Sequence, residues 1–284
     1  MSTNLSPAFV QLFEAEVHQA YQGTSVLAGA VRTRTGVEGN TVNFPKLASG
    51  QAMVRTPATD VVPLNTAFSS VSVTMQDFIA AEYSDIFDQA KINFDERQEL
   101  AQMLGNAIGR KQDQVILDAL AAASAGSTVA NTVVTSGSAS ASDLNVGKII
   151  AAAEALNTKN VPATDRHLVI HASGLASLLS DERAVSSDFV QLQALQRGEI
   201  QSFLGFQIHV LGDRAEGGLA KDGSNDRTNF AFHKSAIGAG VGMPPKTEIN
   251  YIPEKTSFLV SSMLSMAAVA IDVDGIVDVI TRES

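Results

Sequence analysis

One long run of helical periodicity, over residues 93–123, constrains the fold of this chain more than any other feature. Asn93 is a suitable N-cap, and Glu96 three residues later completes a capping-box pattern. Apolar side chains then recur at the spacing of an α-helix, at Leu100, Leu104, Ile108, Val115, Ala119 and Ala122. The other faces carry polar residues, among them Asp113 and Asp118. A helix of about 30 residues is roughly 45 Å long, and a compact chain of 284 residues is about 50 Å across. A single helix is therefore predicted to span nearly the whole molecule.

Two strand-like segments precede this helix, and the chain between them is too long for a tight turn. Residues 41–47 alternate apolar and polar side chains, and residues 68–76 do so more regularly. An isolated two-stranded ribbon is not stable in water, so this arm needs a surface to lie on. A short amphipathic helix is predicted at 6–21. Its apolar stripe, which includes Phe9 and Phe13, must dock on the chain's own core or on a neighbouring subunit.

The rest of the chain predicts short helices and strands joined by polar segments. Further helices are expected at 143–156, 173–179 and 187–197. Strands are expected at 132–135, 167–171, 203–210, 230–233, 247–251, 258–270 and 276–280. Linkers, loops or breaks are expected in the Gly-rich, Ser-rich or polar segments 24–40, 124–143, 212–228 and 238–245.

Composition excludes several classes of protein. The chain has no cysteine, which excludes disulfides, thiolate metal sites and cysteine nucleophiles. Its apolar stretches fall far short of the roughly 20 residues that a membrane-spanning helix needs, and its first residues do not have the pattern of a secretory signal. The net charge is −10, and no more than two basic residues are adjacent. Sequence-specific recognition of nucleic acid is therefore not expected, whereas diffuse contact with bulk DNA stays open.

No residue pattern supports a catalytic, cofactor or metal site. The glycines of 238–242 are followed by prolines and not by the helix that a phosphate loop requires. His167 and His171 lie on a predicted strand, about 13 Å apart, which is too far to share one metal ion. Residues 272–275 (DVDG) predict a turn between two strands. Ser173 follows a strand and opens a helix, but the flanking glycines of a nucleophile elbow are incomplete.

The order of these parts, together with three local segments, resembles the major capsid proteins of tailed double-stranded DNA bacteriophages. The three segments are 197–210 (RGEIQSFLGFQIHV), 230–237 (FAFHKSAI) and 275–280 (GIVDVI). Encapsulins and the floor domain of herpesvirus capsid proteins share this fold. The resemblance implies an α+β fold with an N-terminal arm, an extended two-stranded loop, a peripheral domain with a long spine helix, and an axial α/β domain. The implied boundaries are 1–40 for the arm, 41–80 for the loop, 81–140 and 245–267 for the peripheral domain with its spine helix at 93–123, and 141–244 and 268–284 for the axial domain.

The same resemblance implies a structural protein without cofactors. Its subunits would form hexamers and pentamers of an icosahedral shell, in the virion, after assembly in the bacterial cytoplasm. The implied partners are other copies of the chain, a separate scaffolding protein, a portal, optionally a decoration protein, and packaged DNA contacted without sequence preference, with no membrane. The arm and loop use the residues before the spine helix, so we expect no scaffolding segment within the chain.

Several side chains are expected to contact neighbouring subunits: Phe9, Phe13, Arg32, Arg34, Lys46, Arg55, Glu96 and Glu99. The basic residues of the arm and loop would pair with acidic residues on a neighbour's spine helix. Two other readings stay open at this point. The same fold could form an encapsulin-like compartment around a protein cargo, or the chain could be a soluble α/β hydrolase that uses Ser173.

Overall fold

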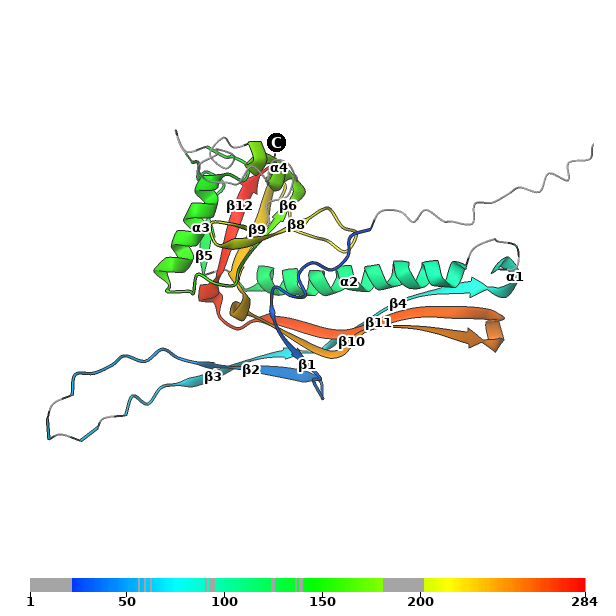
Figure 1. Cartoon of the computed structure of the whole chain (residues 1–284), viewed down its shortest axis with the longest axis horizontal. Coiled ribbons are helices and arrows are strands. Elements are labelled where there is room, and N and C mark those ends of the chain that lie inside the picture. Colours follow the sequence, from blue (N-terminus) through cyan, green and yellow to red (C-terminus); the bar gives the residue numbers. More distant parts are fainter. Residues whose placement is uncertain are drawn as a thin grey trace, which may run out of the picture.

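The computed structural model describes residues 22–55, 57–58, 60–61, 63–89, 91, 95–123, 126–135, 137, 140–180 and 202–283. The helices predicted at 6–21 and 187–197, and with them Phe9 and Phe13, lie outside these residues. Figure 1 shows three parts: a compact sheet with helices at one end, a long helix above a long sheet, and a thin ribbon that projects beyond both.

The long helix is α2 (Glu96–Ala122), which confirms the prediction for 93–123 apart from its first turn. Its N-cap is Asp95, whose side chain accepts a hydrogen bond from Arg97 N, and the predicted N-cap Asn93 lies outside the described residues. The helix lies on a four-stranded sheet with the order β1-β10-β11-β4. The strands are β1 (Arg32–Thr35), β10 (Ile237–Ile252), β11 (Ser257–Ala270) and β4 (Gln76–Asp85). A short helix, α1 (Ile86–Gln89), follows β4.

Two predictions about this sheet are wrong. The segment 24–40 is not a linker, because it contains β1 and because Leu27 and Val31 are buried in the core beside α2. The segment 238–245 is not a break, because β10 runs through it and pairs with β11 along its length. Irregularities in the register between Val241 and Lys246 accommodate the two prolines at an otherwise continuous strand. Both segments contain few large apolar side chains, so each forms a strand only by pairing with strands that are distant in the sequence.

The second sheet has six strands in the order β5-β12-β9-β6-β8-β7. These are β5 (Ser127–Val129), β12 (Ile276–Arg282), β9 (Asp226–His233), β6 (Arg166–His171), β8 (Phe206–Leu211) and β7 (Ser202–Phe203). The helices α3 (Val146–Thr158) and α4 (Ala172–Ser180) pack with it in one apolar core. Residues 132–135, which were predicted to be a strand, are not one; the strand of this region is β5, a few residues earlier. The strand predicted at 203–210 is divided at Leu204 and Gly205, which both have positive φ. β9 begins inside the predicted loop 212–228.

A second core joins α2 to both sheets, with Ile116 and Leu120 of the helix beside Phe232 of β9 and Leu264 of β11. The helix therefore ties the two sheets into one packed body. Its inner stripe differs from the prediction in its C-terminal half, where Asp113 is fully buried although the periodicity placed it on an outer face. No helix among the described residues is both long and apolar enough to cross a membrane.

The ribbon consists of β2 (Thr41–Leu47) and β3 (Phe68–Thr74), paired antiparallel from Thr41↔Thr74 to Leu47↔Phe68. The described residues between 48 and 67 form its open end (Figure 1). Two short 3₁₀ turns, η2 (Pro253–Lys255) and η3 (Val273–Gly275), connect β10 to β11 and β11 to β12, while η1 (Lys234–Ala236) joins β9 to β10. The turn predicted at 272–275 is thus confirmed.

Candidate assembly surfaces

The base of the ribbon is held in a socket made by glycines of β10. Val42 and Phe44 are each only 2% exposed and pack with Ile271 in a small core. A Cβ atom on Gly238 would lie 2.8 Å from Phe44 Cζ, and one on Gly240 would lie 2.6 Å from Val42 Cγ2. No side chain fits in that space, so the glycines let the ribbon cross the sheet at close range. The glycine-rich motif of 238–242 therefore serves packing, as its lack of a following helix suggested.

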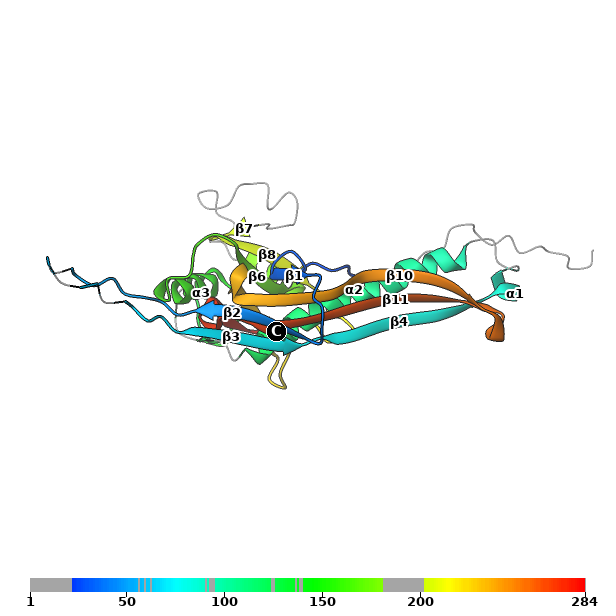
Figure 2. The same cartoon turned by 90° about the horizontal axis from the view of Figure 1, so that it is seen from below.

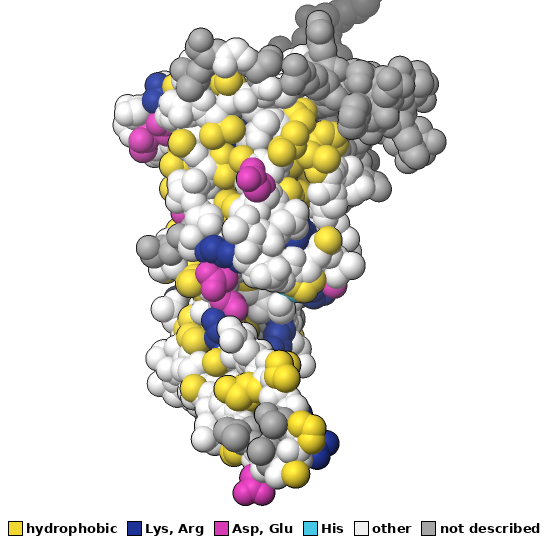
Figure 3. Space-filling model, turned by 90° about the vertical axis from the view of Figure 1, so that its left-hand side faces the viewer, with side chains coloured by type: hydrophobic (Ala, Val, Ile, Leu, Met, Phe, Trp, Pro, Cys, Tyr) yellow, Lys and Arg dark blue, Asp and Glu magenta, His cyan; other side chains and the backbone are white. Residues whose placement is uncertain are grey.

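Exposed ion pairs also hold the base of the ribbon and the neighbouring turn η3 in place. Lys46 Nζ on β2 lies 2.9 Å from Asp272 Oδ1, and Lys159 Nζ after α3 lies 2.9 Å from Asp274 Oδ1. Lys159 also donates a hydrogen bond to the carbonyl of Gly126 at 2.8 Å. The bond and charge of Lys159 lower the pKa of Asp274. Figure 3 shows acidic and basic side chains side by side on this end of the molecule. Packing and charge together fix the direction in which the ribbon leaves the subunit.

Beyond its base the ribbon exposes an unusual amount of apolar surface. Val54 is 98% exposed and Val61 is 86% exposed. The exposed large apolar residues of the ribbon, which we call the ribbon patch, are Leu47, Met53, Val54, Val61, Leu64 and Phe68. Exposed apolar side chains gathered in one element indicate a surface that is covered by a partner. The ribbon patch is therefore the first candidate assembly surface.

The second candidate is the face of the four-stranded sheet that points away from α2. Figure 2 shows the strands β10, β11 and β4 in front of the helix, with no other element over their far ends. Ile79 and Tyr83 on β4 are exposed there, and their ladder partners Met263 and Leu259 on β11 are partly exposed. These residues form a central apolar stripe, the sheet patch. Its stripe is bordered on β10 by charged residues such as Lys246, the ladder partner of Met263.

A buried carboxylate joins the N-terminal segment to the middle of α2. Asp113 has no exposed surface, and its oxygens accept hydrogen bonds from the Ser25 hydroxyl at 2.8 Å and from the amides of Val26 and Leu27 at 3.0 Å. Arg214 Nη1, from the loop between β8 and β9, lies 2.7 Å from Asp113 Oδ2 and supplies the opposite charge. One side chain therefore connects three segments that are far apart in the sequence.

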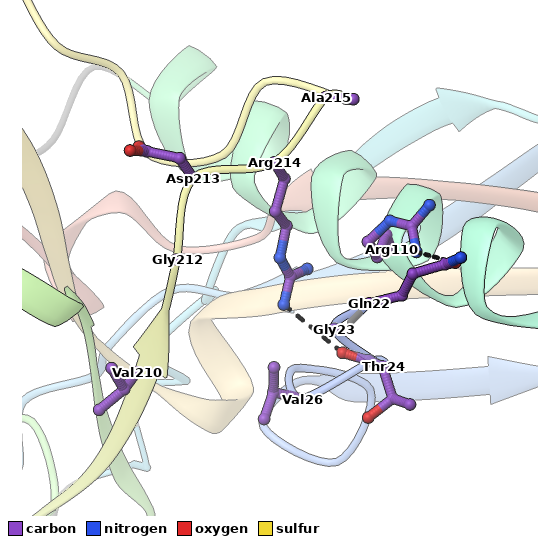
Figure 4. Close-up of a pocket in the computed structure, with 10 residues that line it drawn as sticks. All are labelled: Gln22, Gly23, Thr24, Val26, Arg110, Val210, Gly212, Asp213, Arg214 and Ala215. Atoms are coloured by element: carbon purple, nitrogen blue, oxygen red, sulfur yellow. Dashed lines mark hydrogen bonds between the residues drawn. The ribbon is translucent and has the colours of Figure 1, made fainter. Parts of the chain in front are cut away.

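A surface pocket of about 480 Å³ lies next to this carboxylate (Figure 4). Figure 4 shows Arg214 reaching toward the carbonyl of Thr24, at 3.5 Å, and Arg110 reaching toward Gln22, at 3.0 Å. Arg110 also pairs with Glu216 at 2.9 Å. Each arginine is thus paired with a carboxylate. The residues around this pocket therefore connect α2 to the N-terminal segment and to the loop between β8 and β9.

The last described residue of the chain anchors the loop between β8 and β9. The Glu283 carboxylate binds Arg227 Nε at 2.6 Å and Lys221 Nζ at 2.9 Å. Arg227 also lies 3.3 Å from Asp213, which in turn is 3.4 Å from His171 Nε2. Because this loop also carries Arg214 and Glu216, it links the six-stranded sheet to the middle of α2.

Ser173, the residue of the hydrolase alternative, belongs to this cluster. Its hydroxyl donates to Glu283 Oε1 at 2.6 Å and lies 2.8 Å from His171 Nδ1, which also accepts from Ser173 N at 3.3 Å. Burial opposes ionisation of Glu283, but hydrogen bonds from Arg227, Ser173 and Lys221 outweigh it and lower its pKa to about 2. The single hydrogen of the Ser173 hydroxyl is thus directed at an ionised carboxylate that also binds Arg227 and Lys221, so the serine is one link in this structural cluster. Within the described ranges, no group of three or more acidic or histidine side chains is placed to hold a metal ion.

The remaining predicted contact residues lie on several surfaces. Arg32 and Arg34 are exposed on the edge strand β1, and Arg34 Nη1 is 3.4 Å from the carbonyl of Asn43. Arg55 is exposed in the open end of the ribbon. Glu96 and Glu99 lie half-buried in the first turn of α2. Glu96 accepts a hydrogen bond from the Ser84 hydroxyl at 2.6 Å, so the start of the helix is also bound to β4 of its own subunit.

Comparison with known proteins gives one family and one fold. The profile of the family described as "Phage capsid protein" matches residues 5–283. The structure is similar to the capsid of cyanophage P-SCSP1u, with a TM-score of 0.73, 16% identity, and coverage of 98% of this chain and 94% of that chain. It is also similar to the head of Helicobacter pylori bacteriophage KHP40, with a TM-score of 0.74, 10% identity, and coverage of 99% and 98%. A structure of Mycobacterium phage Che8 has a TM-score of 0.68, 18% identity and 98% coverage of both chains. A search of curated proteins finds no match.

Proposed function

The chain belongs to the phage capsid protein family, and from this membership we propose how its surfaces build a head shell. It is a structural subunit of the shell and not an enzyme, and it associates with further copies of itself. We infer that the copies form hexamers and pentamers, which close an icosahedral shell around packaged double-stranded DNA. A net charge of −10 suits this task, because a negative wall does not bind DNA strongly.

The ribbon of one subunit is proposed to lie on the sheet patch of the next. The observation that carries this proposal is the ribbon patch, which projects apolar side chains such as Val54 and Val61 into solvent from a rigidly held base. The sheet patch offers a complementary apolar stripe that includes Ile79 and Tyr83. A contact of this kind is modest for each pair of subunits but is repeated around the shell. Repetition makes the assembly strong while single contacts stay reversible.

Charge pairs between subunits are a second part of the proposal. Arg32, Arg34 and Arg55 are exposed on β1 and the ribbon. Their proposed partners are acidic side chains of a neighbouring α2, with Glu96 and Glu99 as the candidates in its first turn. Exposed pairs of this kind contribute at most about 1 kcal/mol each and weaken with salt. These charge pairs would therefore fix how neighbouring subunits align, and would add little to the strength of the contact.

The proposed division of the subunit follows these surfaces. It consists of an N-terminal arm at 1–40, an extended loop at 41–80, a peripheral domain at 81–140 and 245–267, and an axial domain at 141–244 and 268–284. Phe9 and Phe13 of the arm are further proposed contacts with a neighbour. Assembly in the host cytoplasm with a separate scaffolding protein, a portal and optionally a decoration protein completes the proposal.

Electron microscopy of the purified chain and of its native particles tests the proposal. Hexamers, pentamers or closed polyhedral shells are expected. Arg55→Glu should shift assembly toward higher protein concentration at low salt, and this shift should shrink as salt is added. Small compact particles under every condition would overturn the assembly proposal. Normal assembly of Arg55→Glu at all salt concentrations would overturn the role of that arginine alone.

A further inference from the structure

Two histidines face each other inside the six-stranded sheet. His167 on β6 is 4% exposed, and its Nδ1 lies 3.0 Å from Nε2 of His209 on the neighbouring strand β8. The His167 ring also packs against Phe232 of β9, with 5.7 Å between ring centroids. His167 Nε2 is buried and has no hydrogen-bond partner within the described part of the chain. The contact bridges two parallel strands at the centre of this part of the subunit.

This geometry disfavours an added proton on the His167 ring. One nitrogen of the pair must carry the hydrogen that lies between the rings, and the other must accept it. A proton added to His167 Nε2 would point an N–H into a buried site without an acceptor, which is costly. A proton added at the contact itself would set two N–H groups against each other. If both rings were charged, they would also repel each other at this distance.

The charged groups around the pair do not compensate for this cost. On the favourable side are Asp113 of α2, whose charge acts on His209, and Asp165 before β6, whose charge acts on His167. On the unfavourable side are Lys234 of η1 and His233 at the end of β9. Asp113 is already occupied by Arg214 and by backbone amides. Burial, then His209 and Lys234, lower the pKa of His167 to about 4, and burial lowers the pKa of His209.

We propose that the His167–His209 pair is an acid-sensitive joint, so that mild acid loosens β6 from β8 while the long sheet under α2 stays closed. The direction follows from linkage. A histidine with a lowered folded-state pKa binds a proton more readily when its surroundings open. Stability is therefore lost as pH falls below the ordinary value of about 6.5, and for His167 the loss ends near its folded value of about 4. Within a shell, this joint would make the six-stranded part the first to yield to acid.

Hydrogen–deuterium exchange of the full chain in its assembled form, measured between pH 7.5 and pH 4.5, tests the joint. After correction for the intrinsic effect of pH, exchange in peptides covering β6 and β8 should rise by more than about tenfold, because a shift of one pKa unit corresponds to a factor of 10. Peptides from β11 should not respond. In His167→Asn/His209→Gln the amide groups can replace the ring contact but cannot be charged, so the rise should fall to less than about twofold. A parallel rise in the wild type and the double variant, or no rise in the wild type, would overturn the proposal.

Two controls keep the result interpretable. The double variant must melt at the wild-type temperature at pH 7.5. If it does not, His209→Gln alone is used, since His209 is only half-buried; this variant keeps His167, so it should reduce the rise in exchange without abolishing it, and an undiminished rise would overturn the proposal. His233→Asn removes a third histidine whose Nδ1 accepts a hydrogen bond from Ser235 N at 3.2 Å, a bond that an asparagine oxygen can replace. This variant should keep most of the wild-type response, and loss of the response here would assign the sensing to His233 and refute the joint.

Discussion

The buried Asp113 side chain holds three distant segments of the chain together: α2, the segment at 25–27, and the loop between β8 and β9. In Asp113→Asn the guanidinium of Arg214, whose side chain is 8% exposed, would remain buried without its counter-charge. Breaking a buried pair in this way costs about 3–5 kcal/mol, so we expect the free energy of unfolding to fall by that order. Urea denaturation of the unassembled chain measures it. Asp118→Asn is the matched control, because Asp118 is exposed on the same helix and accepts a hydrogen bond from Gln114 at 2.7 Å. A similar small loss in both variants would contradict the role of Asp113.

The sequence did contain a signal for Asp113, although the periodicity alone was misleading. Gly109, Asp113, Ile116 and Leu120 follow each other at spacings of 4, 3 and 4, which places the aspartate in an otherwise apolar stripe. The stripe that was predicted instead continued through Val115, which is only partly buried. An acidic residue in an apolar stripe indicates a buried partner. Its identity, Arg214, lies 101 positions away and could not be predicted from local pattern.

At the scale of elements, the glycine socket under the ribbon makes a prediction that a double-mutant cycle can test. Gly240→Ala would place a Cβ atom 2.6 Å from Val42 Cγ2. Overpacking of this kind typically costs about 1–3 kcal/mol, so thermal unfolding should begin at a lower temperature. Val42→Ala should also be destabilising, because it leaves a cavity. The double variant should be more stable than the sum of the two losses predicts, since the small side chain at 42 makes room for the new methyl group.

Gly105→Ala is the control for that cycle. A Cβ atom at Gly105 meets nothing within 4 Å, and the residue lies in the interior of α2. The substitution should therefore stabilise the chain by about 0.5–1 kcal/mol through helix propensity. Strict additivity of Gly240→Ala and Val42→Ala would show that the two side chains do not share this space.

The elements that could be predicted are those whose own side chains define them. The long helix, the alternating strands of the ribbon and the strand at 258–270 all have internal periodicity and were predicted close to their final positions. β1 and the first half of β10 were missed because Arg32–Thr35 is exposed throughout and 238–242 is mostly glycine. Such segments become strands only when they pair with each other and receive side chains from elsewhere. The candidate surfaces were predicted as a need for a partner, but not as particular patches.

At the scale of the whole molecule, rigid joints surround one projecting element. The loop between β8 and β9 links Glu283 in the six-stranded part to Asp113 in α2, and the glycine socket fixes the ribbon to the long sheet. The subunit therefore holds the base of the ribbon in a defined direction from its own core. A surface that is built this way can bind a partner without first paying the entropy of ordering its base.

The ribbon patch should consequently matter for assembly and not for the fold of one subunit. In the triple variant Met53→Ser, Val54→Ser and Val61→Ser, each replaced side chain is at least 75% exposed, so each change should alter monomer stability by no more than about 0.5 kcal/mol. Burying these side chains against a neighbour is worth about 1.5–3 kcal/mol for a fully covered residue, which is repeated at every interface of a shell. We therefore expect a normal melting temperature for the unassembled chain and at least a tenfold higher protein concentration at the onset of shell formation, measured by light scattering and electron microscopy. Unchanged assembly with an unchanged melting temperature would show that the ribbon patch is not an interface, and a lowered melting temperature would show that it stabilises its own subunit.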